Sequence, residues 1–210
     1  MPLHKIVRLS NSKIWGIWNL TESVDDILKL VHPIDGKVYD DITHPNKIKE
    51  WAGSRVLAQR LCEEEGWDYP GIAKDEYGKP YFNDWSLGIS VSHKYPYVAV
   101  MLDQYNDVGI DVELVQERIL RLGPNFMNDM ELAWAKSAFQ VTIVWAGKEA
   151  LYKLHGRKQL IFKDQLKLEL LEGDEQGGKL SGTIIDGEVE QFELHYEYDD
   201  EGILIVYSLL

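Results

Sequence analysis

The sequence predicts an α+β fold made of two similar halves, each a mainly antiparallel sheet packed by a long helix. Apolar residues recur with helical spacing over 46–65 and again over 129–155, and these stretches stop at Gly66 and Gly156. Strand-like stretches precede and follow both helices. Helices that alternate in this way with paired strands indicate the α+β class.

The expected elements follow from periodicity and turn residues. In chain order, the first half is expected to contain strands at 4–10 and 14–20, a short helix at 23–31, the long helix at 46–65, a loop marked by Pro70, Gly71 and Gly78, and strands at 86–92 and 97–103. The second half is expected to contain a strand at 107–114, the helical stretch at 129–155 and, from residue 160 onward, four strand-like stretches separated by turns around Gly173, Gly177-Gly178, Gly187 and Gly202. The strands at 86–92 and 97–103 are separated only by Lys94-Tyr95-Pro96, which favours a strand pair.

A short internal repeat supports the division into halves. Trp51-Ala52-Gly53 recurs ninety-four positions later as Trp145-Ala146-Gly147, and both copies lie inside expected helices. Three identities in a row can arise by chance, but the matching order of elements favours a duplicated unit. We place the boundary near residues 103–107, which gives halves 1–104 and 105–210.

Composition limits the classes of function. The chain has 210 residues, of which 45% are hydrophobic, so a substantial core can form. Its formal net charge of −13 disfavours generic nucleic-acid binding, which needs a basic surface. No apolar run reaches the length of a membrane span, and the N-terminal stretch lacks the apolar core of a signal peptide. Cys62 is the single cysteine, so a reducing cytoplasm is the expected location.

Two carboxylates occupy one face of an apolar strand in Gly109-Ile110-Asp111-Val112-Glu113. Residues two apart on a strand point the same way, so Asp111 and Glu113 crowd each other unless a cation lies between them. Mg²⁺ fits this role and leaves coordination positions open for phosphate oxygens. The alternative is an ordinary half-exposed strand whose acidic residues face solvent.

A second motif, Trp145-Ala146-Gly147-Lys148-Glu149-Ala150-Leu151-Tyr152-Lys153, lies on the second long helix. Glu149 and Lys153 are four residues apart and share a helix face, with Lys148 next to Glu149. In the functional interpretation, Glu149 is a third oxygen ligand of the metal and Lys153 faces the bound phosphate. A surface salt bridge is the alternative.

Two shorter motifs carry groups that can hold a phosphate. In Ser90-Val91-Ser92-His93, adjacent Ser92 and His93 would point to opposite faces of a strand, which disfavours a Ser–His nucleophilic dyad. Gly78-Lys79-Pro80 is a turn that carries a cation. Polar residues at a turn are the alternative in both cases. The sequence has no P-loop, no Rossmann fingerprint and no zinc spacing.

The four motifs, in this order and spacing, resemble the 4′-phosphopantetheinyl transferase superfamily. The length and the internal repeat are similar to its long, two-half group (the Sfp-like group), and Trp145 and Ala150 match its W/KEA subgroup. The resemblance covers residues 78–153, and the stretch from Arg118 to Glu131 is also similar to the family. It implies two similar α/β halves in a pseudo-twofold arrangement, with the site at the interface of the halves.

The resemblance also implies a reaction. The enzyme would move 4′-phosphopantetheine from coenzyme A, its co-substrate, to a serine of an apo acyl or peptidyl carrier protein, and would release adenosine 3′,5′-bisphosphate. Asp111, Glu113 and Glu149 would bind Mg²⁺, with Mn²⁺ as an alternative. Glu149 would activate the serine hydroxyl, Asp111 would hold the metal, and Lys153 would stabilise the leaving phosphate.

Other positions are assigned to coenzyme A by the same resemblance. They are Lys79, Pro80, Ser92, His93, Arg55 and Lys148, with the first half on the nucleotide side. A non-catalytic coenzyme A-binding protein and a purely structural domain remain as alternatives. We expect a monomer, because two halves supply the pairing that a half-length relative obtains by oligomerising. Fatty-acid, polyketide and nonribosomal-peptide carriers all stay open as partners.

Overall fold

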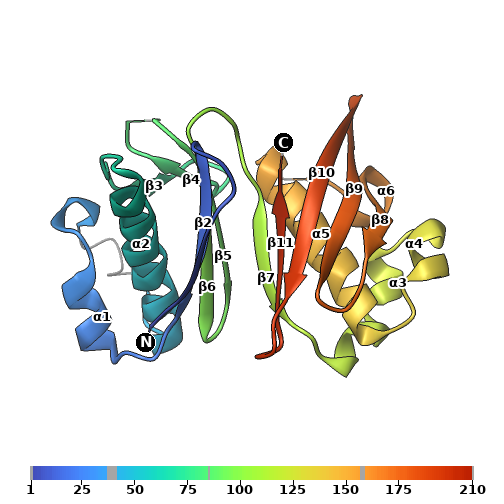
Figure 1. The fold of residues 1–210 in the computed structure, drawn as a ribbon, viewed down its shortest axis with the longest axis horizontal. Coiled ribbons are helices and arrows are strands. Elements are labelled where there is room, and N and C mark those ends of the chain that lie inside the picture. Colours follow the sequence, from blue (N-terminus) through green and yellow to red (C-terminus); the bar gives the residue numbers. More distant parts are fainter. Residues whose placement is uncertain (1, 37–41, 85, 157–158, 210) are drawn as a thin grey trace. The chain divides into compact units, whose positions relative to one another are not determined.

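The computed structural model describes residues 2–36, 42–84, 86–156 and 159–209. The chain forms two compact units, residues 1–107 and 108–210. Each unit contains an antiparallel sheet and one long helix (Figure 1), so the predicted α+β class with antiparallel sheets is confirmed. The pseudo-twofold arrangement of the halves stays a prediction. Within the described ranges, every helix is too short or too polar to cross a bilayer.

The N-terminal unit has a four-stranded sheet in the order β1-β2-β6-β5 and a separate β3-β4 pair. Its elements are β1 (Leu3–Arg8), β2 (Lys13–Asn19), α1 (Val24–Leu30), α2 (Pro45–Glu65), β3 (Ile72–Lys74), β4 (Pro80–Phe82), β5 (Gly88–Lys94) and β6 (Tyr97–Asp103), with a 3₁₀ turn at Pro33–Asp35. The expected strand pair is confirmed, because β5 and β6 run antiparallel throughout. The expected loop after α2 instead contains β3 and β4, each three residues long. Strands of three residues are too short for an alternation of apolar and polar side chains to be recognised in the sequence.

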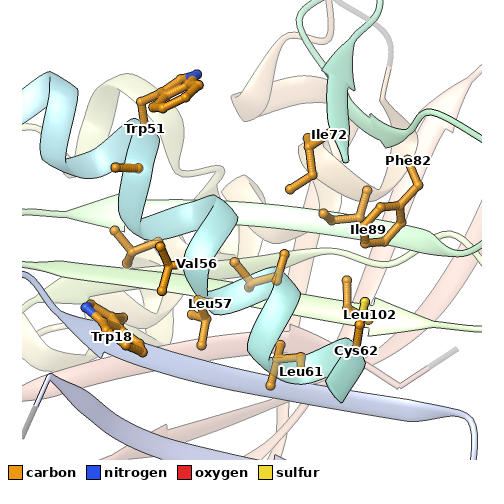
Figure 2. Packing of buried hydrophobic residues seen from close by; sticks show 14 of the residues in the cluster. Trp18, Trp51, Val56, Leu57, Leu61, Cys62, Ile72, Phe82, Ile89 and Leu102 are labelled. Atoms are coloured by element: carbon orange, nitrogen blue, oxygen red, sulfur yellow. The ribbon is translucent and has the colours of Figure 1, made fainter. Parts of the chain in front are cut away.

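Helix α2 begins and ends at residues suited to those positions. The Nδ1 atom of His44 accepts a hydrogen bond from the backbone N–H of Asn46, and Gly66 ends the helix in the left-handed conformation at φ 70°. Leu57 and Leu61 are fully buried in the core that joins α2 to the sheet (Figure 2). This core fixes α2, and therefore the residues it carries, against β2 and β6.

The C-terminal unit has one five-stranded antiparallel sheet in the order β7-β11-β10-β9-β8. Its elements are β7 (Ile110–Leu114), a 3₁₀ turn at Glu117–Arg121, α3 (Gly123–Phe126), α4 (Asp129–Trp134), α5 (Ala138–His155), α6 (Phe162–Gln165), β8 (Leu166–Gly173), β9 (Gly177–Asp186), β10 (Glu188–Tyr198) and β11 (Ile203–Ser208). The four strands expected after residue 160 are confirmed. Helix α5 packs along the sheet and contacts β7, β8, β9 and β11.

The predicted helical stretch at 129–155 is two helices. Helix α4 ends at Trp134, and α5 starts after Ser137. The Ser137 side chain accepts from the N–H of Gln140, whose side chain accepts in return from the N–H of Ser137, a capping box that begins a new helix. This Ser-x-x-Gln signal is present in the sequence, but the apolar spacing continues through it and therefore predicts a single helix.

The glycines of the two repeated tripeptides both lie in tightly packed long helices. Gly53 lies in α2, where an added Cβ would stand 2.5 Å from Leu20 Cδ2, and Gly147 lies in α5, where it would stand 2.6 Å from Leu168 Cδ1. Real Cβ atoms do not come so close to other heavy atoms. The glycine of each copy therefore permits close packing of a long helix.

Gly109 sets the distance between β7 and α5. A Cβ at this position would stand 2.0 Å from the carbonyl oxygen of Ala150 in α5 and 3.1 Å from Leu154 Cβ. Gly109 also donates its N–H to Ser208 Oγ at 3.0 Å. The absence of a side chain at Gly109 lets the strand lie directly against the helix backbone.

We predict that Gly109→Ala destabilises the protein by about 3 kcal/mol, because strand and helix backbones would have to separate. Urea unfolding followed by circular dichroism measures the change. Gly123→Ala is the matched control, since its Cβ would meet the flexible Met127 Sδ at 3.2 Å and Val141 Cγ1 at an ordinary contact distance of 3.5 Å. Equal stability of the two variants would contradict this account of Gly109.

Candidate functional site

Asp111 and Glu113 lie on the face of β7 that packs on α5. Gly109, on the same face, already abuts α5, and both carboxylates contact side chains of that helix. The intervening Ile110 and Val112 are buried. Asp111 is only 4% exposed, so the alternative of a half-exposed strand with solvent-facing carboxylates is wrong for this residue.

Helix α5 presents three polar side chains to these carboxylates. Trp145, Glu149 and Lys153 are spaced four apart and therefore share a helix face. The Trp145 Nε1–H donates to Glu113 Oε1 at 3.1 Å. Lys153 Nζ lies 2.6 Å from Asp111 Oδ1 and donates to the carbonyl of Ile110 at 3.1 Å. The structure thus brings Asp111, Glu113, Glu149 and Lys153 together.

The pKa of Glu149 is shifted by its surroundings in this group. Loss of solvent, followed by repulsion from Asp111, raises the pKa of Glu149 from 4.5 to about 7; Lys153 opposes the rise and Glu113 adds to it. The cause is physical proximity of three carboxylates in a poorly hydrated site. A carboxyl group with this pKa can take up or release a proton near neutral pH.

The same carboxylates decide whether a divalent cation fits. Among the described residues, no three His, Cys, Asp or Glu side chains stand close enough together to hold a metal as they are. The ammonium of Lys153 neutralises Asp111 instead. The donor set nevertheless suits a hard cation, because it consists of oxygen ligands whose mutual repulsion, seen in the raised pKa of Glu149, a cation would relieve. The residues therefore fit Mg²⁺ in chemical type.

An aromatic row borders the carboxylates. Trp145 lies 5.0 Å from Phe126 and 5.6 Å from Phe162 between ring centroids, and Phe162 lies 5.4 Å from Tyr152. Edge-on and tilted packing of this kind orients each ring. The row therefore fixes the indole that donates to Glu113.

Lys148 is not part of this cluster. It is fully buried, with its Nζ 2.7 Å from Glu131 Oε2, and it donates to the carbonyls of Phe126 and Phe162 at 2.7 and 2.8 Å. Burial lowers the pKa of Lys148, and the hydrogen bond to Glu131 opposes this. The sequence interpretation assigned Lys148 to coenzyme A. In the structure its ammonium instead links α3 and α6, the helices before and after α5 that carry Phe126 and Phe162.

Glu131 is the residue that the sequence interpretation missed here. Its carboxylate accepts from the N–H groups of Asn128 and Leu168 at 2.8 and 2.9 Å, besides pairing with Lys148. Asn128 and Glu131 form a capping box at the start of α4. The Asn-x-x-Glu spacing is a sequence signal for the cap but not for the pairing with a lysine seventeen positions later.

Arg55 is held inside the N-terminal unit. It is 5% exposed, its guanidinium lies 4.2 Å from the Trp51 ring, and its Nε stands 3.6 Å from Asp35 Oδ1. Asp35 also accepts from Tyr69 and from the N–H of Ile72. Arg55 therefore anchors the segment around β3, and a phosphate contact would require it to leave these partners.

The remaining N-terminal candidates lie at two places. Lys79, after the β3-β4 turn, pairs with Asp107 at 2.9 Å, and Pro80 begins β4. On β5, Ser92 is buried and His93 is exposed, so the predicted opposite orientation of the two side chains is confirmed. His93 Nδ1 lies 3.6 Å from Glu50 on α2, a partner that the sequence interpretation did not include.

The region that carries the carboxylate cluster is similar to known proteins. Residues 107–206 match the 4′-phosphopantetheinyl transferase superfamily. A stretch of 94 residues is also 31% identical to the 4′-phosphopantetheinyl transferase gsp of Aneurinibacillus migulanus, covering 42% of this chain and 39% of that protein. The aligned part of the chain thus spans about two fifths of the length of this curated relative. In both matches the similarity is to 4′-phosphopantetheinyl transferases, and residues 107–206 contain the whole carboxylate cluster.

We predict that Glu149→Gln raises the free energy of unfolding at pH 8, measured with EDTA present, by about 1–3 kcal/mol. The pKa of Glu149 is raised on folding, so the unfolded chain loses this proton first, and stability falls as pH rises from 4.5 to 7. The difference between variant and wild type should therefore vanish near pH 4. Glu169→Gln, at an exposed position on β8, is the control. A pH-independent difference would contradict the assignment.

We also predict that Lys148→Met lowers the free energy of unfolding by about 3–5 kcal/mol, because it leaves the Glu131 carboxylate buried without its cation. Lys163→Met is the matched control, since Lys163 donates to the Pro124 carbonyl at the surface. Unchanged stability together with weaker coenzyme A binding would instead assign Lys148 to the ligand.

Proposed function

We propose that this protein transfers 4′-phosphopantetheine from coenzyme A to a serine of an apo acyl or peptidyl carrier protein and releases adenosine 3′,5′-bisphosphate. The observation that carries the proposal is Glu149, a carboxyl group with a pKa of about 7 next to Asp111 and Lys153. The match of residues 107–206 to the superfamily supports it.

The reaction joins a serine oxygen to the pantetheine-bearing phosphorus and breaks the bond from that phosphorus to the bridging oxygen of the pyrophosphate. Glu149 in its ionised form accepts the hydroxyl proton, directly or through water. The ammonium of Lys153 faces the leaving phosphate and stabilises the charge that develops there.

Asp111 and Glu149 would hold Mg²⁺, with Glu113 as a ligand or a water-mediated partner fixed by Trp145. A bound Mg²⁺ would neutralise charge on the pyrophosphate. For that binding, Lys153 would release Asp111 and become available to the phosphate. Mn²⁺ has the same preference for oxygen ligands.

The finer parts of the proposal rest on motif order and residue type. Lys79, Pro80, Ser92 and His93 would bind the nucleotide end of coenzyme A, including its 3′-phosphate. Trp145 and Ala150 support assigning the protein to the W/KEA subgroup of the Sfp-like group. We expect the protein to be cytoplasmic and monomeric, and a dimer in light scattering would contradict the latter.

The test is intact-protein mass spectrometry of apo carrier proteins incubated with this protein, coenzyme A and Mg²⁺. We expect a gain of one phosphopantetheine that EDTA prevents. Asp111→Ala and Glu149→Gln should each reduce the rate at least about a hundredfold, because each removes a group that acts in the transition state. The exposed Glu169→Gln is the control.

Binding of coenzyme A is measured in parallel by calorimetry. Glu149→Gln is expected to retain this binding while it loses transfer. Wild-type protein that binds coenzyme A and modifies no fatty-acid, polyketide or peptide carrier would be a non-catalytic coenzyme A-binding protein. Activity retained in Asp111→Ala would overturn the metal assignment.

A further inference from the structure

A cavity of about 460 Å³ in the C-terminal unit is separate from the carboxylate cluster of Asp111, Glu113 and Glu149. Three parts of the chain line it, namely the segment after β7, the start of α5 and the turn between β8 and β9. None of the three clustered carboxylates is among the described residues that line it. The volume lies in the range of ligand-binding cavities, and the proposed transfer reaction does not use it.

Aromatic rings form part of the wall of this cavity, and their own contacts hold them in place. Phe139, in the first turn of α5, lies 6.2 Å from Tyr196 and 5.0 Å from Tyr198 between ring centroids. The Tyr196 hydroxyl donates to the carbonyl of Asp174 at 2.8 Å. A Cβ added to Gly173 would collide with that hydroxyl, so glycine permits the β8-β9 turn to close on Tyr196. The cavity is therefore formed before a ligand enters it.

The side chains around the cavity carry negative charge. Glu117, Asp174 and Glu175 are exposed residues that line it, and no described residue that lines it is basic. Asp174 Oδ1 accepts from the backbone N–H groups of Gln176 and Gly177 at 2.8 and 3.2 Å, which fixes this carboxylate on the turn. Within the described part of the chain, neither Glu117 nor Glu175 forms an ion pair. The cavity therefore attracts a cation.

Two other classes of ligand fit the cavity less well. The start of a helix often binds an anion, but the side chains of the α5 capping box already accept the N–H groups of Lys136, Ser137 and Gln140. A bare metal ion needs several converging oxygen ligands, and no three acidic, histidine or cysteine side chains of the described residues converge in this way. An organic cation suits both the aromatic wall and the carboxylates, because its charge interacts with ring faces as well as with anions.

We propose that this cavity receives a lysine or arginine side chain of a partner protein. The alkyl part of that side chain would lie against Phe139 and Tyr196, and its charged end would meet Glu117 and Glu175. The β8-β9 turn is exposed, so one side of the cavity is open and the partner's backbone can cover it. A basic partner surface also complements the net charge of −13 of this chain.

The test is an NMR titration of the whole ¹⁵N-labelled chain with Nα-acetyl-lysine N-methylamide, followed at the backbone amides of Phe139 and Glu175. We expect a Kd on the order of 1 mM, because a single side chain supplies few contacts. The arginine analogue should bind with similar affinity. Nα-acetyl-norleucine N-methylamide has the apolar chain without the charge and should bind at least about fivefold more weakly. Equal affinities for the charged and uncharged compounds would overturn the assignment to a cation.

Substitutions at the cavity test its charges and its wall separately. Glu117→Gln and Glu175→Gln should each weaken binding of the lysine compound about threefold, and the double variant about tenfold. Phe139→Leu should weaken it about threefold through loss of the ring. Glu169→Gln is the matched control, because Glu169 is exposed on β8 and does not line the cavity. Unchanged affinity in the double variant would overturn the role of the carboxylates, even if Phe139→Leu does not fold.

A further compound distinguishes a side chain of a protein from a free amine. n-Butylammonium carries the same charge on a similar chain but has no peptide groups to cover the open side of the cavity. We expect it to bind at least about threefold more weakly than the lysine compound. Equal or tighter binding would assign the cavity to a free alkylamine, and no shift with any compound would overturn the site itself. The titration uses neither coenzyme A nor a carrier protein, so its failure leaves the transferase proposal intact.

Discussion

The close packing of β7 on α5 is the constraint on which the C-terminal unit depends. Gly109 brings the strand against the helix backbone, so the two side chains that follow it on the same face, Asp111 and Glu113, meet the helix at short range. A larger residue at Gly109 would move both carboxylates away from Glu149 together. The raised pKa of Glu149 is a consequence of this distance, because repulsion and loss of solvent both decrease as the elements separate.

Buried charge has two different uses in this unit. Lys148 and Glu131 are completely enclosed, and their remaining hydrogen-bonding capacity is satisfied by backbone groups, so they serve the fold. Lys153 and Asp111 form an equally short pair, but the lysine is 23% exposed and is within reach of the surface. An ion pair can exchange its partner for a ligand only if one of its side chains reaches solvent, as Lys153 does. One helix thus carries both an enclosed lysine that links its unit together and a lysine that reaches the surface.

Much of the fold was predictable from the sequence, because long helices and alternating strands extend over enough residues to give a clear period. The break between α4 and α5 was missed, although Ser137 and Gln140 carry the signal, because apolar spacing continues through it. The β3-β4 pair was missed because three residues cannot establish a period of two. For the site, the spacing of Glu149 and Lys153 predicted a shared face, which the structure confirms.

The sequence by itself determined which chemical groups are present and which of them lie on one face of one element. Glu149 and Lys153 share a face because a helix repeats every 3.6 residues, and Asp111 and Glu113 share one because a strand repeats every two. Only the tertiary structure decided which partner each face meets. It turned the strand face toward α5, enclosed Lys148 with Glu131, and placed Glu50 beneath His93. Local periodicity cannot supply these results, since they depend on packing between segments far apart in the chain.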